Sequence, residues 1–150
     1  MAIYYLETTA LVKLYLRETG TDRLLSLADR SAENLLAILA LAPVELRSAV
    51  RRRERTGEFP SHVAARLLDE FQRHVEGRFV IQMVTAFVFD IASALVDRYG
   101  LRAYDAVQLA GYLAFRGSTG PEVPILVCSD RELLKAAEQE GIPALDPSAA

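Results

Sequence analysis

The sequence has little that could cross-link the chain, anchor it in a membrane or bind soft metals. Its 150 residues include one cysteine, Cys128, and two histidines. One cysteine cannot form an internal disulfide, and this usage is typical of a reducing compartment, so we expect a cytoplasmic protein. The longest apolar run, residues 35–44, is far shorter than the roughly 20 residues that span a bilayer. The apolar stretch after Met1 meets Glu7 too early for a signal peptide, so we expect no membrane partner.

Charge of neither sign dominates the chain. There are 17 basic and 20 acidic residues, for a net charge of −3. A chain of this charge is not a nonspecific coat for nucleic acid, although a local arginine patch or bound metal ions could still bring nucleic acid to it. Apolar residues make up 51% of the chain, which excludes a disordered protein and is enough for one well-buried domain.

Short apolar runs of strand character alternate with amphipathic segments of helical period. Strands are predicted over residues 2–6, 35–40, 79–83, 125–127 and 142–145. Helices are predicted over residues 8–20, 21–30, 43–56, 61–77, 85–100, 103–115 and 129–141. The alternation predicts an α/β protein whose mostly parallel sheet is covered by helices on both faces.

Polar residues at the predicted helix starts suggest N-caps. Thr8 or Thr9 can cap the first helix, and Ser61 can cap the fourth. Ser129 and Glu132 have the spacing of a capping box at the start of the last helix.

Four carboxylates fall at comparable places, each just after a predicted strand or in the first turn of a helix: Glu7, Glu45, Asp105 and Asp130. Each has a purely structural explanation, because the helix dipole favours acids in a first turn. Asp105 is the hardest to explain in this way. Its helix is apolar on nearly all sides, so the carboxylate must face a polar cleft or lose hydration at a high cost.

Several carboxylates at one sheet edge repel one another unless cations lie between them. Ligation by oxygen alone suits Mg²⁺ or Mn²⁺ and argues against a His/Cys zinc site. Such ions activate water and stabilise charge on a phosphodiester, so no side-chain nucleophile is needed. Cys128 is therefore expected to be a small buried residue near the site.

Four segments resemble the PIN-domain ribonucleases, and within them the VapC-like toxins of type II toxin–antitoxin modules. These segments are YLETTALVKLYL, PVELRSAV, LRAYDAVQLA and VCSDRELLKAAEQEGIPALDP. The resemblance implies a PIN-like α/β/α sandwich of about five strands, with residues 1–147 as a single domain and residues 148–150 as a tail. It also implies Mg²⁺- or Mn²⁺-dependent cleavage of RNA, a cognate antitoxin and a homodimer.

The same resemblance assigns roles to individual residues. It places the four acids at the catalytic, metal-binding positions of the family, with Thr8, Ser129 and Gln108 in support. The first acid of the family is usually Asp, whereas this chain has Glu7. The extra methylene moves the carboxylate oxygens, so the alternative is a catalytically impaired module that binds RNA or antitoxin. A phosphatase with an aspartyl nucleophile is disfavoured because it needs Asp at this position.

Basic side chains near the predicted site are candidates for binding substrate phosphate. Lys13 and Arg17 lie one turn apart after the first acid, and Arg51 and Arg52 belong to a cluster at a helix end. That cluster could contact RNA or an antitoxin, or simply be a solvated helix end. The helices predicted over residues 21–30 and 43–56 are candidates for a dimer contact.

Overall fold

The computed structural model describes residues 1–149, and its central layer is a sheet of five strands in the order β3-β2-β1-β4-β5. The strands are β1 (Ile3–Leu6), β2 (Leu35–Leu39), β3 (Phe79–Gln82), β4 (Ile125–Val127) and β5 (Ala144–Leu145). Every neighbouring pair is parallel. The short apolar runs form strands because both faces of the sheet are covered, which confirms the predicted fold class.

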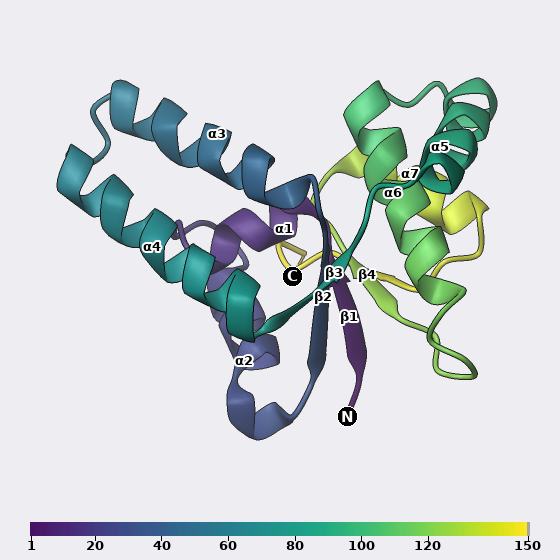
Figure 1. Cartoon of the computed structure of the whole chain (residues 1–150), viewed down its shortest axis with the longest axis horizontal. Helices are drawn as coiled ribbons and strands as arrows, with labels where there is room; N and C mark the ends of the chain where they lie inside the picture. The colour runs from purple at the N-terminus through teal and green to yellow at the C-terminus, as the bar shows by residue number, and fades with distance from the viewer. Residues whose placement is uncertain (150) are drawn as a thin grey trace.

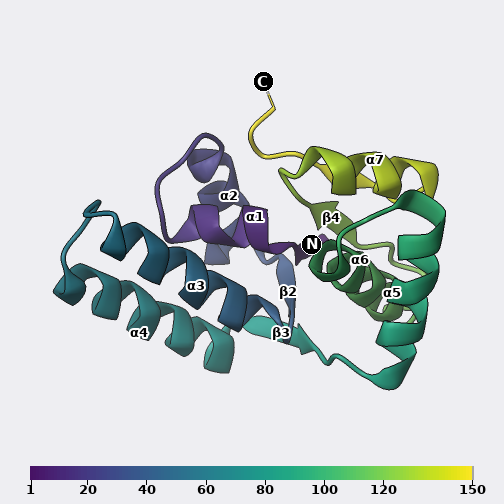
Figure 2. The same ribbon diagram turned by 90° about the horizontal axis from the view of Figure 1, so that it is seen from above.

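Helices cover both faces of the sheet, as Figures 1 and 2 show. One face carries α1 (Thr8–Leu11), η1 (Val12–Leu14), α2 (Thr21–Ala28), η2 (Arg30–Ala32), α3 (Ala42–Arg55) and α4 (Ser61–Gly77). The other face carries α5 (Ala86–Tyr99), α6 (Ala103–Arg116) and α7 (Arg131–Gln139). Each helical layer packs its apolar side chains on the sheet, so the protein has one core on each face. None of the described helices is both long and apolar enough to cross a membrane.

Helix α6 is the most deeply buried helix, as its composition predicts. Leu109, Ala110 and Tyr112 are fully buried in it. Gly111 allows α6 to approach the sheet closely, because a Cβ atom there would collide with Leu39 and Tyr5. The first turn of α6 is therefore held close to the ends of the central strands.

The first predicted helix is much shorter than expected. Residues 8–11 form an α-helical turn and residues 12–14 form a 3₁₀ turn, after which the chain leaves helical geometry. Gly20 precedes α2 with a φ of 98° instead of ending the first helix. A Cβ atom there would lie 2.6 Å from the carbonyl oxygen of Pro147, so this glycine serves a tertiary contact with the C-terminal turn.

The predicted caps of α1 and α4 are also wrong. Glu7 caps α1 with its own carboxylate, which accepts a hydrogen bond from the Thr9 N–H, and Thr8 is the first helical residue. Ser61 begins α4 but makes no capping hydrogen bond. At these two helices, a hydroxyl near the start therefore did not identify the cap.

The C-terminal residues that the structure describes contact the rest of the chain. The Ser148 hydroxyl donates to the carbonyl oxygen of Thr19 at 3.1 Å, and its N–H donates to Asp146 at 2.9 Å. Ala150, the last residue of the predicted tail, lies outside the described residues.

Candidate active site

The acids lie where the connections of neighbouring strands part. After β1 the chain turns to the layer of α1–α4, whereas after β4 it turns to the layer of α7, on the opposite face (Figure 2). Such a divergence opens a crevice at the carboxyl ends of the two strands. Glu7 follows β1 and Asp130 follows β4 by three residues, so these two acids flank the crevice.

Glu7 is turned inward and held in place. Only 3% of its surface is exposed, and its Oε2 accepts from the Thr9 N–H at 2.9 Å and from the Thr9 hydroxyl. Burial raises the pKa of Glu7 to about 7; the bonds from Thr9 oppose this rise and the charge of Glu45 adds to it. One of the two carboxylate oxygens is thus committed to holding the start of α1.

The Thr9 hydroxyl also links α1 to the loop after β4. It accepts a hydrogen bond from the Ser129 N–H at 2.9 Å, on the loop after β4. Cys128, beside it, is fully buried, and its Sγ accepts from the Asp130 N–H at 3.3 Å. Burial raises the pKa of the Cys128 thiol, and the nearby Glu7 charge raises it further. Cys128 is therefore a buried thiol next to the site, as its position in the sequence predicts.

Glu45 comes from the first turn of α3 and is half-buried. Its Oε1 accepts two hydrogen bonds, from the Thr8 hydroxyl at 2.9 Å and from Gln108 Nε2 at 2.7 Å. The structure therefore brings together three residues that the sequence assigned to the site from segments far apart in the chain.

The charges of two other acids act on Asp105. It is in the first turn of α6 and is half-buried. Burial raises its pKa, the charges of Asp130 and Glu45 raise it further, and Arg102 lowers it. Asp105 thus senses an acid from each face of the sheet, which is the placement expected of a shared site.

Asp130 is the N-cap of α7, and its Oδ1 accepts from the Leu133 N–H at 2.9 Å. The predicted capping box at Ser129 is therefore wrong. The Ser129 hydroxyl instead lies 3.0 Å from Asp146 Oδ1 and 3.1 Å from the Ser148 hydroxyl. Ser129 fastens the C-terminal turn to this loop, and its side chain makes no hydrogen bond to the four acids.

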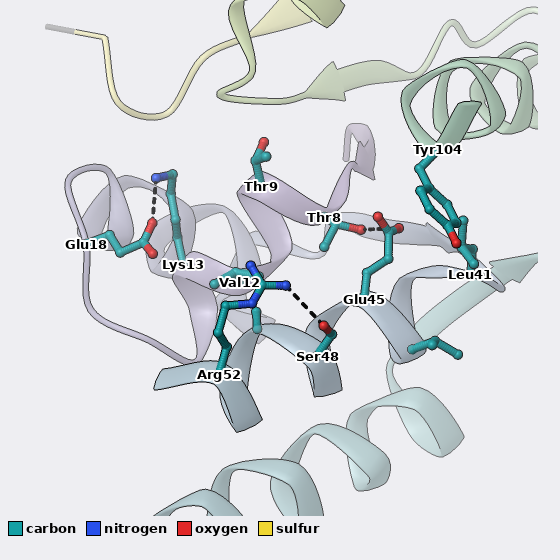
Figure 3. A pocket seen from close by; sticks show the side chains of 12 residues that line it. Thr8, Thr9, Val12, Lys13, Glu18, Leu41, Glu45, Ser48, Arg52 and Tyr104 are labelled. Atoms are coloured by element: carbon teal, nitrogen blue, oxygen red, sulfur yellow. Dashed lines mark hydrogen bonds and ion pairs between the residues drawn. The ribbon is translucent and has the colours of Figure 1, made fainter. Parts of the chain in front are cut away.

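A cavity of about 540 Å³ is lined by one of the four acids, Glu45, whereas Glu7, Asp105 and Asp130 do not line it (Figure 3). Thr8, Thr9 and Glu45 line it, Tyr104 lies next to Glu45, and Lys13 and Glu18 lie on the opposite side. Its other polar lining residues are Ser48 and Arg52. The cavity therefore has acidic and cationic groups within one space, although its walls also include apolar side chains.

The four predicted cationic residues divide into two pairs. Lys13 and Arg52 line the cavity, where Lys13 Nζ pairs with Glu18 at 2.9 Å and Arg52 Nη2 donates to Ser48 Oγ at 3.1 Å (Figure 3). Arg17 forms an ion pair with Asp22, and Arg51 forms one with Glu54. Neither Arg17 nor Arg51 lines the cavity.

Sequence reasoning missed four of the polar lining residues, namely Ser48, Tyr104, Glu18 and Thr9, of which Thr9 was considered only as a helix cap. Ser48 lies one helical turn after Glu45, and Tyr104 directly precedes Asp105, so helix periodicity around the acids could have found both. Glu18 gave no local signal, because it reaches the site through ion pairs with Lys13 and Arg53.

The donor set suits a hard divalent cation, but the acids do not form a finished metal site. The four carboxylates offer only oxygen ligands, and Gln108 Oε1 is a buried acceptor with no hydrogen-bond partner in the part of the chain that the structure describes. Within residues 1–149, no three or more His, Cys, Asp or Glu side chains are grouped closely enough to hold a metal ion. The chemistry of the site therefore fits Mg²⁺ or Mn²⁺, and binding requires the carboxylates to draw together.

Comparison with known proteins agrees with this architecture. The sequence model of the PIN domain matches residues 4–118, and the chain belongs to the PIN domain family. No curated protein matches the sequence.

Solved structures share the fold at low sequence identity. A toxin–antitoxin complex from Klebsiella pneumoniae is 17% identical, with a TM-score of 0.62 over 96% of this chain and 97% of that one. VapBC2 from Rickettsia felis, bound to a DNA fragment from its promoter, is 17% identical, with a TM-score of 0.63 over 95% and 97%. PAE2754 from Pyrobaculum aerophilum is 24% identical, with a TM-score of 0.65 over 95% and 83%.

Proposed function

We propose that this protein is a metal-dependent endoribonuclease and the toxin of a type II toxin–antitoxin pair. The observation that carries the proposal is the placement of Asp105, half-buried in the first turn of α6, where burial raises its pKa and the charges of Asp130 and Glu45 raise it further. Membership of the PIN domain family supports it, because PIN domains are generally nucleases.

Glu45, Asp105 and Asp130 would hold the cation, which is Mg²⁺ or Mn²⁺. Glu7 would contribute at most one oxygen, because Thr9 holds the other. When bound, such an ion lowers the pKa of a water molecule and stabilises the charge of a phosphodiester under attack. The protein supplies the negative field that attracts the ion and fixes the carboxylates around it.

Lys13 and Arg52 would bind the RNA backbone on the cationic side of the cavity. Lys13 is only 7% exposed and is balanced by Glu18, so its charge is directed into the cavity rather than toward bulk solvent. Arg52 presents a guanidinium, which suits phosphate. Arg17 and Arg51 lie outside the cavity and could contact only flanking nucleotides.

The toxin part of the proposal is supported by the complexes named above, one described as a toxin–antitoxin complex and one as VapBC2. We propose an antitoxin partner on this basis, and a homodimer on the basis of an exposed apolar surface. Four large exposed apolar side chains, Val44, Met83, Phe89 and Tyr104, line a second cavity, and two of them, Val44 and Tyr104, also line the first one. This surface is our candidate for the dimer contact. It includes Val44 of the helix predicted over residues 43–56, whereas the helix predicted over residues 21–30 contributes the exposed Leu25 elsewhere. A Phe89→Asp variant that sediments as the wild type does would contradict it.

A binding module without catalysis is the second candidate. It is favoured by the position of Glu7, whose carboxylate caps α1 instead of projecting freely into the crevice. In that case the same surface would bind RNA or antitoxin without cleaving.

The test is cleavage of single-stranded RNA by the purified protein with Mn²⁺ or with EDTA. The nuclease proposal predicts cleavage that is lost with EDTA and in Asp105→Asn, but kept in Asp90→Asn, a matched change on the exposed face of α5. Cleavage by Glu7→Asp alone would support the binding module as the natural state. Absence of cleavage by both forms would contradict the nuclease assignment.

A further inference from the structure

Three side chains close a triangle of hydrogen bonds at the site. The Thr8 hydroxyl donates to Glu45 Oε1 at 2.9 Å, and Gln108 Nε2 donates both to that oxygen at 2.7 Å and to the Thr8 hydroxyl oxygen at 2.8 Å. Gln108 is 1% exposed and Thr8 is 8% exposed. The triangle joins the first residue of α1, the first turn of α3 and the middle of α6.

The triangle fixes the orientation of the Gln108 amide. Its nitrogen faces two oxygen acceptors, and the reversed amide would point its oxygen at the Glu45 carboxylate. The amide oxygen Oε1 is therefore directed away, where it is buried and has no partner among the described residues. An unpaired buried amide oxygen costs free energy, so the two hydrogen bonds of the amide nitrogen must offset that cost.

The close packing of α6 makes this reach possible. Gly111, one turn after Gln108, lies against Leu39 and Tyr5 with no room for a Cβ atom. In addition, the Tyr5 hydroxyl lies 3.3 Å from the carbonyl oxygen of Gln108, to which it donates. The backbone at Gln108 is thus fixed against β1. The packing of α6 on the sheet, rather than a loop, therefore positions the Gln108 side chain beside Glu45.

The two hydrogen bonds leave the carboxylate of Glu45 with unequal oxygens. Oε1 accepts both bonds, and Oε2 accepts neither. We propose that Thr8 and Gln108 are positioning residues that clamp Oε1, so that Glu45 presents Oε2 alone to the divalent cation. This inference rests on the proposed metal-dependent function.

The physical effect of such a clamp is preorganisation. It compensates the partial burial of the charged carboxylate with two hydrogen bonds and selects one rotamer before the ion arrives. Partners that orient a metal ligand in this way typically change metal affinity by about 10–100-fold. Because both act on one oxygen, their effects are not expected to be independent.

The first experiment measures Mn²⁺ binding by the loss of the free-ion EPR signal. Gln108→Leu and Thr8→Val should each weaken binding by about 10-fold or more, and the double variant should lose less than the product of the two. Thr8→Ser keeps the hydroxyl and should restore binding to near the wild-type value. Tyr112→Phe is the control, because it removes a buried hydrogen bond from the same helix, to the carbonyl oxygen of Pro124, away from Glu45.

The second experiment needs no metal and separates the clamp from the proposed function. In EDTA, Gln108→Leu should lower the melting temperature by several degrees, and by clearly less when Glu45→Ala has already removed the acceptor. Equal losses in the two backgrounds would overturn the clamp whatever the metal does. Unequal losses without any Mn²⁺ binding by the wild type would overturn its role toward a cation and the metal-dependent function together. Wild-type Mn²⁺ affinity in Gln108→Leu would overturn the positioning role alone.

Discussion

The segments that follow β1 and β4 each place an acid at a helix N-cap, but the two carboxylates differ in their exposure to solvent. In each, an acid follows a buried strand and caps the next helix, Glu7 for α1 and Asp130 for α7. Glu7 is 3% exposed and caps a helix of 4 residues, whereas Asp130 is half-exposed and caps a helix of 9 residues. The longer side chain of Glu7 folds back onto Thr9, so position in the chain alone does not decide which acid is available to a ligand.

The largest expected difference between the two loops is in RNA cleavage. Asp130→Asn should lower Mn²⁺-dependent cleavage by about 10²–10³-fold, because it removes a charge that faces Asp105, and such electrostatic contributions have this size. Glu7→Gln should cost about 10-fold, because one Glu7 oxygen is already committed to Thr9. Rates are measured on one RNA at saturating Mn²⁺. Equal losses would show that Glu7 contributes as much to cleavage as Asp130 does.

The pH dependence of stability should report on Glu7 in the absence of metal. The folded state raises the pKa of Glu7 from its ordinary 4.5 to about 7, so the folded protein holds a proton that the unfolded chain releases. This proton stabilises the fold, and the contribution is lost as the pH rises from 4.5 through about 7. The full effect is about 3 kcal/mol, or roughly 5–10 °C in melting temperature.

Glu7→Gln is the variant that checks this slope, because its amide keeps the shape of the carboxylic acid and does not titrate. Melting temperatures in EDTA should fall between pH 5 and pH 8 for the wild type, and much less for Glu7→Gln. If both proteins lose the same number of degrees, another group causes the slope.

The link between the two loops should have a smaller effect. Thr9→Val removes a hydroxyl that donates to Glu7 and accepts from the Ser129 N–H, and it leaves that N–H without its partner. The expected cost is about 1–2 kcal/mol, or about 3–6 °C. Thr9→Ser should recover most of it. A Thr9→Val protein as stable as the wild type would show that the loops are held together by packing alone.

The smallest expected effect is that of the cap of α7. Asp130→Ala should lose about 1 kcal/mol of stability and Asp130→Asn almost none, because Asn is as good an N-cap as Asp. Thermal unfolding at pH 7 measures both. Equal loss in the two variants would mean that the charge of Asp130, rather than its bond to Leu133, stabilises the helix.

The strands and most helices follow from the sequence because burial sets their pattern. The five predicted strands lie where expected, and α3, α4, α5 and α6 begin within one residue of the predicted starts. The predicted length of the first helix was wrong, because the apolar spacing of Leu11, Leu14 and Tyr15 is also compatible with a short helix followed by a 3₁₀ turn. Over two turns, the apolar spacing cannot distinguish a continuous α-helix from this combination.

The site was less predictable, since its details depend on contacts between distant segments. The sequence placed the acids at strand ends, and the connections that part after β1 and β4 bring Glu7 and Asp130 to the same edge. It did not indicate that Glu7 would cap its own helix, or that Ser129 would turn to the C-terminal residues. These choices are made by partners such as Asp146, 17 residues further on, which no local pattern reports.

Crystals soaked in Mn²⁺ and measured at the manganese absorption edge test the proposed metal site. We expect an anomalous peak in the crevice, bonded to carboxylate oxygens of Asp105, Asp130 and Glu45, with Glu7 still paired to Thr9. The same soak of Asp105→Asn should lose the peak. No peak at this edge of the sheet, in crystals of a protein that cleaves RNA with Mn²⁺, would contradict the proposed site.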